Sequence, residues 1–109
     1  MNLDAVGKAL EIKLAGAVTT NQLPITASYA DLDATFAVIA AAAVDLQTNN
    51  ATAVVVAAGL AIGARKITDL SVCNKDTVQA IVTVRINNGG TMRDLLTVPL
   101  EPGESLIYG

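Results

Sequence analysis

The stretch TVQAIVTVRI, residues 77–86, together with the NNGG that follows at 87–90, carries the clearest fold signal in this chain. Apolar residues recur at every second position from Val78 to Ile86, a period of two that predicts a half-buried β-strand. Asn-Gly accepts the positive φ values of a tight hairpin turn. We therefore predict a hairpin whose turn residues are Asn88 and Gly89, or a four-residue loop of the same register, with Thr91–Val98 as the returning strand. This register sets Arg85 diagonal to Asp94.

Other segments are also expected to be short strands. Lys8–Leu14 alternates, with Leu10, Ile12 and Leu14 on one face and Glu11 and Lys13 on the solvent face. Pro24 fits the start or edge of a strand over Leu23–Tyr29, because proline lacks an N–H. A polar turn at 74–76 follows the expected strand Arg65–Cys73, and another at 101–104 precedes the expected strand Ser105–Tyr108. Pro99 is expected to end the strand that comes before the second turn.

Residues 34–46 are ambiguous. Asp31 or Asp33 fits the cap of a helix over Phe36–Leu46, and the many alanines favour that helix. The β-branched residues in the same segment fit an extended, buried strand equally well. We favour the strand, because Thr52–Ala57 then forms a hairpin partner across the turn-rich residues 47–51.

Composition supports an all-β chain. Val, Ile and Thr supply 31 of the 109 residues, and such β-branched side chains pack well on pleated sheets. We predict one antiparallel β-sandwich or jelly-roll-like domain over residues 1–109, with seven or eight short strands. The apolar fraction of 52% excludes intrinsic disorder. No run of about 20 apolar residues and no signal peptide is recognisable, so no membrane partner is expected.

The residue inventory excludes most active-site chemistry. There is no histidine and one cysteine, which removes the Ser-His-Asp and Cys-His arrangements and the commonest metal sites. We therefore expect no enzyme activity, no metal and no cofactor. A net charge of −3 without a basic run makes nucleic acid an unlikely ligand, and three aromatics offer little for a glycan to stack on.

Individual residues have structural interpretations. We expect Cys73 to be a small buried or half-buried hydrophobe, chemically idle, because no base accompanies it. Asp31 and Asp33 are expected in a solvated loop, since calcium needs more oxygens than these two supply. Tyr29 and Phe36 are expected in the core, and Gly89-Gly90 belongs to a hairpin rather than a phosphate loop.

Two stretches carry a family resemblance. The first is AVTTNQLPITASY at 17–29; the second is ITDLSVCN from Ile67, continued by DTV at 76–78, VTVR at 82–85, NGGT at 88–91, Leu100, PGESL at 102–106 and Tyr108. The chain resembles small β-sandwich structural proteins of tailed bacteriophage virions. At Cys73, those relatives commonly carry an aromatic.

The resemblance implies a noncatalytic virion protein, a capsid decoration (cement) protein that stabilises the head. The alternatives are a tail or head–tail accessory protein or, from another class, a host-surface or glycan-binding module. Implied partners are identical subunits and the major capsid protein or other virion proteins, in a particle assembled in the bacterial cytoplasm.

Residues 34–64 form the expected assembly segment. Asp45 is its only ionisable side chain, and twelve of its 31 residues are alanine. Small alanines fill a two-sided core poorly, so we predict an exposed apolar patch that identical subunits or the capsid cover. The predicted contact residues are Phe36, Val38, Ala41, Ala57 and Leu60, and a charge at Ala41 or Ala57 is expected to block assembly without unfolding the chain.

Overall fold

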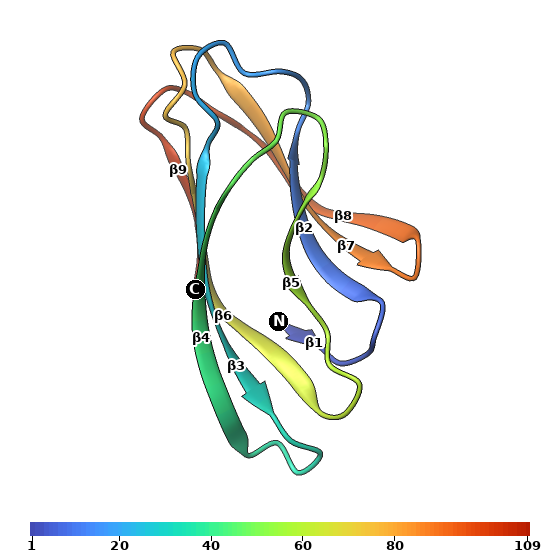
Figure 1. The fold of residues 1–109 in the computed structure, drawn as a ribbon. Helices are drawn as coiled ribbons and strands as arrows, with labels where there is room; N and C mark the ends of the chain where they lie inside the picture. The colour runs from blue at the N-terminus through green and yellow to red at the C-terminus, as the bar shows by residue number, and fades with distance from the viewer.

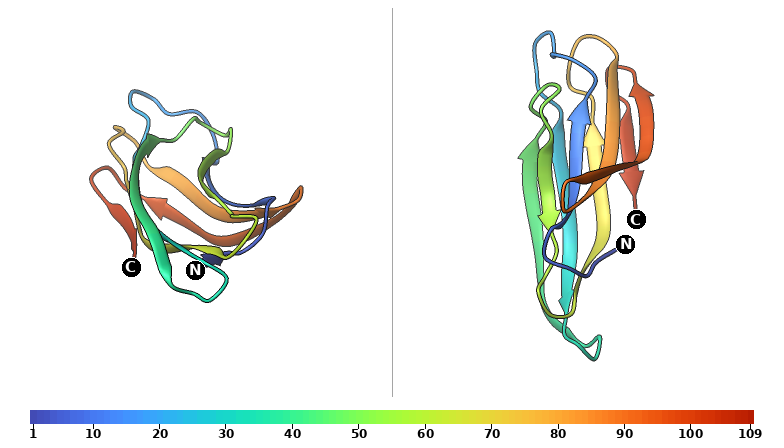
Figure 2. Two further views of the ribbon diagram at one scale, coloured as in Figure 1. Left: turned by 60° about the horizontal axis from the view of Figure 1, so that its bottom comes forward. Right: turned by 90° about the vertical axis from the view of Figure 1, so that its right-hand side faces the viewer.

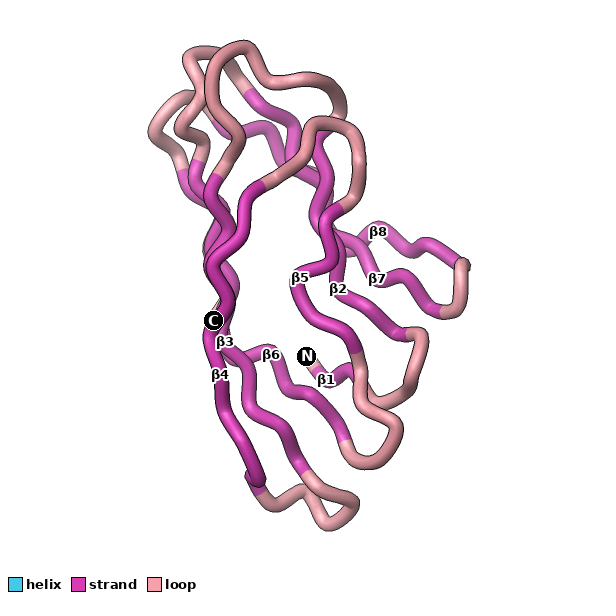
Figure 3. Tube along the Cα trace, in the orientation of Figure 1, coloured by secondary structure: helices cyan, strands magenta, loops and turns pink.

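The computed structural model describes residues 1–109 and contains nine β-strands and no helix (Figures 1 and 3). These form two antiparallel sheets, which confirms the predicted all-β sandwich with nine strands rather than seven or eight. The strands are β1 (Asn2–Leu3), β2 (Lys8–Leu14), β3 (Pro24–Leu32), β4 (Val38–Gln47), β5 (Val54–Ala58), β6 (Ala64–Cys73), β7 (Ala80–Asn88), β8 (Thr91–Leu100) and β9 (Ser105–Tyr108).

Sheet A has the order β1-β6-β3-β4 with β9 also paired to β6, and sheet B has the order β5-β2-β7-β8. Only β3–β4 and β7–β8 are joined within a sheet, so the other six connections pass between the sheets. Four of these crossings gather at one end, the top of Figure 1, and we call them the upper loops (residues 15–23, 48–53, 74–79 and 101–104). The connections at the opposite end are the lower loops (residues 4–7, 33–37, 59–63 and 89–90).

The ambiguous segment is a strand, but its predicted hairpin partner is wrong. β4 pairs with β3 from Pro24↔Gln47 to Leu32↔Val38, whereas β5 pairs with β2 in the other sheet. The connection between β4 and β5 is therefore a crossing. The reason is core packing, because pairing with β2 places Val56 and Ala57 among the buried residues of the sandwich.

The core lies between the inner faces of the two sheets. Leu10, Ile12 and Leu14 of β2 are buried there as predicted, opposite the inner residues of sheet A. Central members of the core from the other strands are Ile25, Ala27, Ile67, Leu70, Val72, Val82 and Val84. Pro24 begins β3, as its missing N–H requires, and β8 continues through Pro99 to Leu100, which an edge strand tolerates.

Glu11 departs from the simple alternating pattern of β2. It was expected in solvent, but it is only 6% exposed. The Arg85 Nε donates to its Oε1 at 2.9 Å and the Asn87 Nδ2 donates to its Oε2 at 3.1 Å. Both partners come from β7, next to β2, so a hydrogen-bonded ion pair compensates the burial of this carboxylate.

The hairpin between β7 and β8 is confirmed, but its turn lies one residue later than predicted, so each residue of β7 next to the turn faces a partner two positions further along β8. Asn88 pairs with Thr91, so Gly89 and Gly90 are the two turn residues rather than Asn88 and Gly89. Both glycines have positive φ, +63° and +95°, as this turn requires. The Asn87 side chain accepts a hydrogen bond from the Gly90 N–H, and this register places Arg85 directly opposite Asp94, before a bulge between Arg85 and Val84.

Buried polar side chains tie the upper loops together. Asn74 is fully buried, and its Nδ2 donates to the carbonyl oxygens of Val78 and Leu100 at 2.9 and 2.8 Å. Its Oδ1 accepts a hydrogen bond from the Asp76 N–H. One side chain thus joins the 74–79 turn to the end of β8.

Asp76 ties a second pair of upper loops. Its carboxylate accepts backbone hydrogen bonds from Thr19, Thr20 and Asn21 at 2.8, 2.7 and 3.2 Å. These bonds lower the pKa of Asp76 to about 2, and the bond from Thr19 has the largest effect. Burial alone would raise this pKa, because it disfavours the charged form. The 15–23 loop is thereby fixed to the 74–79 turn.

The edge of sheet A beyond β6 is shared by two short strands. β1 pairs with Arg65 and Lys66 at one end of β6, and β9 pairs with Leu70–Cys73 at the other. The amino group of Met1 donates to the Tyr108 hydroxyl at 3.1 Å. The two strands therefore follow one another along the same neighbour.

We expect Gly89→Val to destabilise the protein by about 1 kcal/mol or more, because valine is strained at φ +63°. Gly89→Asn is the matched control, since asparagine tolerates the left-handed region. No other heavy atom lies within 4 Å of the Gly89 Cβ position, so steric contact does not explain a loss. Denaturant melts of the three proteins measure the effect, and equal midpoints for the valine variant and the parent would contradict this turn geometry.

Asp76→Asn should remove a pH-dependent contribution to stability. Because the folded pKa is about 2 against an ordinary value of 3.8, the charged form stabilises the fold above pH 4, and this contribution is lost as the pH falls from about 4 to about 2. The thermal midpoint of the variant should lie below the parent at pH 7, and the gap should narrow through that window. Asp94→Asn, an exposed carboxylate, serves as control. A gap that stays constant down to pH 2 would be inconsistent with the tie.

Candidate assembly surface

The most prominent exposed apolar feature is β4 with the turn before it. Phe36, Val38 and Ile39 are 67%, 65% and 63% exposed, and Ala40–Ala43 are also exposed. Asp45 is the one charged residue here. We call Phe36, Val38, Ile39, Ala40–Ala43 and Asp45 the β4 surface. Figure 2 (right) shows β4 as the outermost strand on one side of the molecule.

The turn that precedes β4 is organised by Asp33. Its Oδ1 accepts hydrogen bonds from the Thr35 hydroxyl at 2.7 Å and from the N–H groups of Thr35 and Ala37 at 2.8 and 3.0 Å. These bonds, that from the Thr35 side chain foremost, lower the pKa of Asp33. The expected helix cap is therefore an Asx-type turn that introduces a strand.

Phe36 occupies a strained backbone conformation within this turn. Its φ is +64°, which is rare for a large side chain and carries an energetic cost. Its ring is exposed, which corrects the expectation that Phe36 belongs to the core. The Asp33 hydrogen bonds hold a backbone conformation that directs an aromatic side chain into solvent. Strain of this kind is characteristic of functional positions.

The predicted contact residues separate into two groups. Phe36, Val38 and Ala41 belong to the exposed β4 surface. Ala57 does not, because it is 5% exposed inside the core, and Leu60 is half-buried in a lower loop. A charge at Ala57 would therefore unfold the chain rather than test an interface. Sequence reasoning missed Ile39, which is as exposed as its neighbour Val38.

Asp31 and Tyr29 form a polar cluster on β3 with Arg65 of β6. The Arg65 Nε and Nη2 donate to the two oxygens of Asp31 at 2.8 and 3.2 Å, which raises the pKa of Arg65. The guanidinium lies 4.1 Å from the Tyr29 ring centroid, and its Nη1 donates to the Ala58 carbonyl of sheet B. Asp31 is thus in a strand and paired, not in a solvated loop. Tyr29 is half-buried against the core, as expected.

A second apolar feature lies on the opposite edge of sheet A. A groove of about 260 Å³ runs between β8 and β9, and all of its lining is apolar. Leu95, Leu96 and Ile107 at its rim are 46%, 44% and 74% exposed. Sequence patterns gave no sign of it, because it joins strands from different sheets. Half-buried Cys73, on β6 opposite Ser105, is a free thiol, in keeping with its predicted environment.

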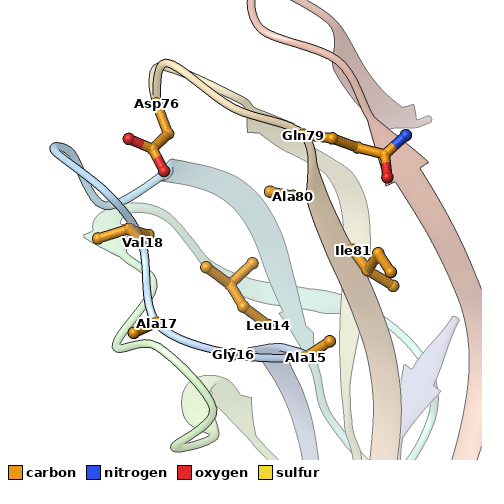
Figure 4. Close-up of a pocket in the computed structure, with 9 residues that line it drawn as sticks. All are labelled: Leu14, Ala15, Gly16, Ala17, Val18, Asp76, Gln79, Ala80 and Ile81. Atoms are coloured by element: carbon orange, nitrogen blue, oxygen red, sulfur yellow. The ribbon is translucent and has the colours of Figure 1, made fainter.

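A pocket of about 150 Å³ lies beneath the upper loops (Figure 4). Asp76 is its only charged lining residue, and its oxygens are already bonded to loop N–H groups. The Gln79 side chain turns away from the pocket and donates to Glu101. The charged group here therefore has a structural role.

No three His, Cys, Asp or Glu side chains come together as a metal site would require. The structure has no helix that could cross a membrane.

Comparisons of the chain with protein-family models, with curated proteins and with solved structures find no match.

We expect Phe36→Gly to stabilise the isolated protein by roughly 0.5–1 kcal/mol, because glycine removes the left-handed strain at little packing cost. Phe36→Ala is the matched control, since it removes the same ring but keeps a Cβ at φ +64°. Urea unfolding of the two variants separates the contributions of ring and backbone. A glycine variant less stable than the alanine variant would show that the turn is not strained.

Proposed function

We propose that this chain is a noncatalytic structural protein of a tailed-bacteriophage virion, a capsid decoration protein that stabilises the head. The observation that carries the proposal is the β4 surface, an apolar strand and turn left in solvent beside a closed core. The resemblance of residues 17–29 and 67–108 to small β-sandwich virion proteins supports a place in a phage particle.

An exposed apolar edge strand is a hazard for a protein that acts alone. Such edges pair with other chains and aggregate unless charged residues, proline or a covering element protect them. The β4 surface has none of these protections apart from Asp45. In an assembled particle the same surface is covered by a neighbour, so the exposure becomes a means of attachment.

The energetics fit attachment in many copies. Phe36, Val38 and Ile39 are each about two-thirds exposed, so covering one contributes about 1–2 kcal/mol. A single contact of this size is weak. Repeated through the symmetry of a shell, such contacts add up without any one of them being strong.

Charge favours protein partners over nucleic acid. The net charge is −3, and two of the three arginines are bound in ion pairs, Arg65 with Asp31 and Arg85 with Glu11. Little positive charge is left to bind phosphates. The proposed partners are identical subunits and the major capsid protein, in a virion assembled in the host cytoplasm.

Particle incorporation tests the proposal. Phages that encode Ala41→Glu or Phe36→Gly should yield purified virions that have lost most copies of the protein, while both variant chains remain folded in isolation. Thr97→Glu, on exposed β8 away from the β4 surface, is the matched control and should incorporate normally.

Quantitative mass spectrometry of purified particles gives the copy number, and a density map gives the position. Absence of the parent protein from virions, or normal incorporation of both β4 variants, would overturn the proposal. Density confined to the tail would assign the chain to the tail accessory proteins instead.

A further inference from the structure

The free edges of the two sheets differ in how they are protected. Beyond β6, sheet A ends in β1 and β9, of two and four residues. In sheet B, β5 has five residues, and the Ala58 carbonyl at its end accepts a hydrogen bond from Arg65. β8 is long but carries Arg93, Asp94 and Pro99, which discourage pairing.

β4 is the exception among these edges. It has ten residues, none of them Lys, Arg or Pro, and it pairs only with β3. In an antiparallel strand, alternate residues direct their N–H and C=O groups to the two sides. The side of β4 away from β3 therefore offers a row of backbone donors and acceptors along its length.

From this edge we infer that two copies of the chain pair through β4, antiparallel and about a two-fold axis, so that sheet A continues from one copy into the other. The inference rests on the proposed structural role, and it names the partner of the β4 surface as a second copy of the chain. An isologous contact suits it, because such an interface needs a single self-complementary patch.

Pleat geometry limits the register. Val44 and Leu46 pack against the core, so by alternation Ala40 and Ala42 share the inner face while Ala41, Ala43 and Asp45 share the outer one. A two-fold axis normal to the sheet keeps each face on its own side, and directly opposed residues share a face. The axis must therefore pass beside a residue that pairs with its own copy, and we place it within Ala40–Ala43, the uncharged middle of the strand.

Charge is compatible with every such register. Even with the axis beside Ala43, Asp45 of one copy lies opposite Ala41 of the other. The two Asp45 carboxylates are then four strand positions apart, about 14 Å. That separation exceeds the screening length of about 8 Å at physiological salt. No other charge lies on β4, so no like-charge pair opposes the contact.

Single-cysteine cross-linking tests the geometry. In a Cys73→Ser background, cysteine is placed in turn at Ala40, Ala41, Ala42 and Ala43, with Thr97→Cys on β8 as the matched exposed-edge control. Cβ atoms of directly opposed residues are close enough for a disulfide. One of the four positions should form disulfide dimers roughly tenfold or more faster than the control, because pairing raises the local thiol concentration.

Sedimentation of the parent, Ala41→Glu and Thr97→Glu provides the second readout. The parent and Thr97→Glu should dimerise with rising concentration, whereas Ala41→Glu, which sets a carboxylate against its own copy or against Asp45, should stay monomeric with an unchanged circular dichroism spectrum. A parent that remains monomeric, or cross-linking equal at all four positions and the control, would overturn the pairing.

The pairing and the proposed function fail separately. Monomeric parent protein that is still lost from virions on Ala41→Glu substitution would refute the pairing and keep the structural role. Protein that dimerises in solution but is absent from virions would keep the pairing and refute the structural role.

Discussion

The alignment of the two sheets depends on hydrogen bonds that two buried side chains, Asn74 and Asp76, make among the upper loops. All four upper loops cross from one sheet to the other, and the chain has a single cysteine and no disulfide to fix them. The two side chains bond to the backbone of two of these loops, 15–23 and 74–79, and to the end of β8, and they are themselves buried. Because buried polar groups are costly when unpaired, these bonds define one arrangement of the crossings and hence the alignment of the sheets.

The opposite end and the sides of the sandwich are built differently. Arg65 links β3, β6 and the end of β5 through its guanidinium. In contrast, Phe36 in the turn before β4, and Val38 and Ile39 at the start of β4, remain in solvent. A rigid upper end with an exposed apolar edge is the combination expected of a subunit that folds alone and then attaches. In the proposed assembly, the upper end would supply the shape and the exposed strand the contact.

The fold class was predictable because residues 77–86 and 8–14 alternate apolar and other residues with a period of two. Three features were not. The partner of β4 could not be identified because an alanine-rich segment has no strongly apolar face, and the burial of Glu11 depends on Arg85, 74 positions away. The hairpin register was mispredicted because the sequence Asn-Asn-Gly-Gly at 87–90 can place either Asn-Gly or Gly-Gly at the two turn positions. The exposure of Phe36 had a weak signal, since Asp33 followed by Thr35 is typical of a turn, but an aromatic residue is ordinarily assigned to the core.

The placement of β1 and β9 along β6 has a consequence for engineering. β9 is antiparallel to β6 and ends with Tyr108 opposite Leu70, while the Met1 carbonyl accepts the Ile67 N–H and Asn2 lies opposite Lys66. Both segments run in the same direction, so they amount to one edge strand interrupted between Gly109 and Met1. A short linker across that gap would make the strand continuous and allow the chain to be opened at a lower loop instead. Such a circular permutant would present new termini, and any peptide fused to them, at a chosen face of the sandwich.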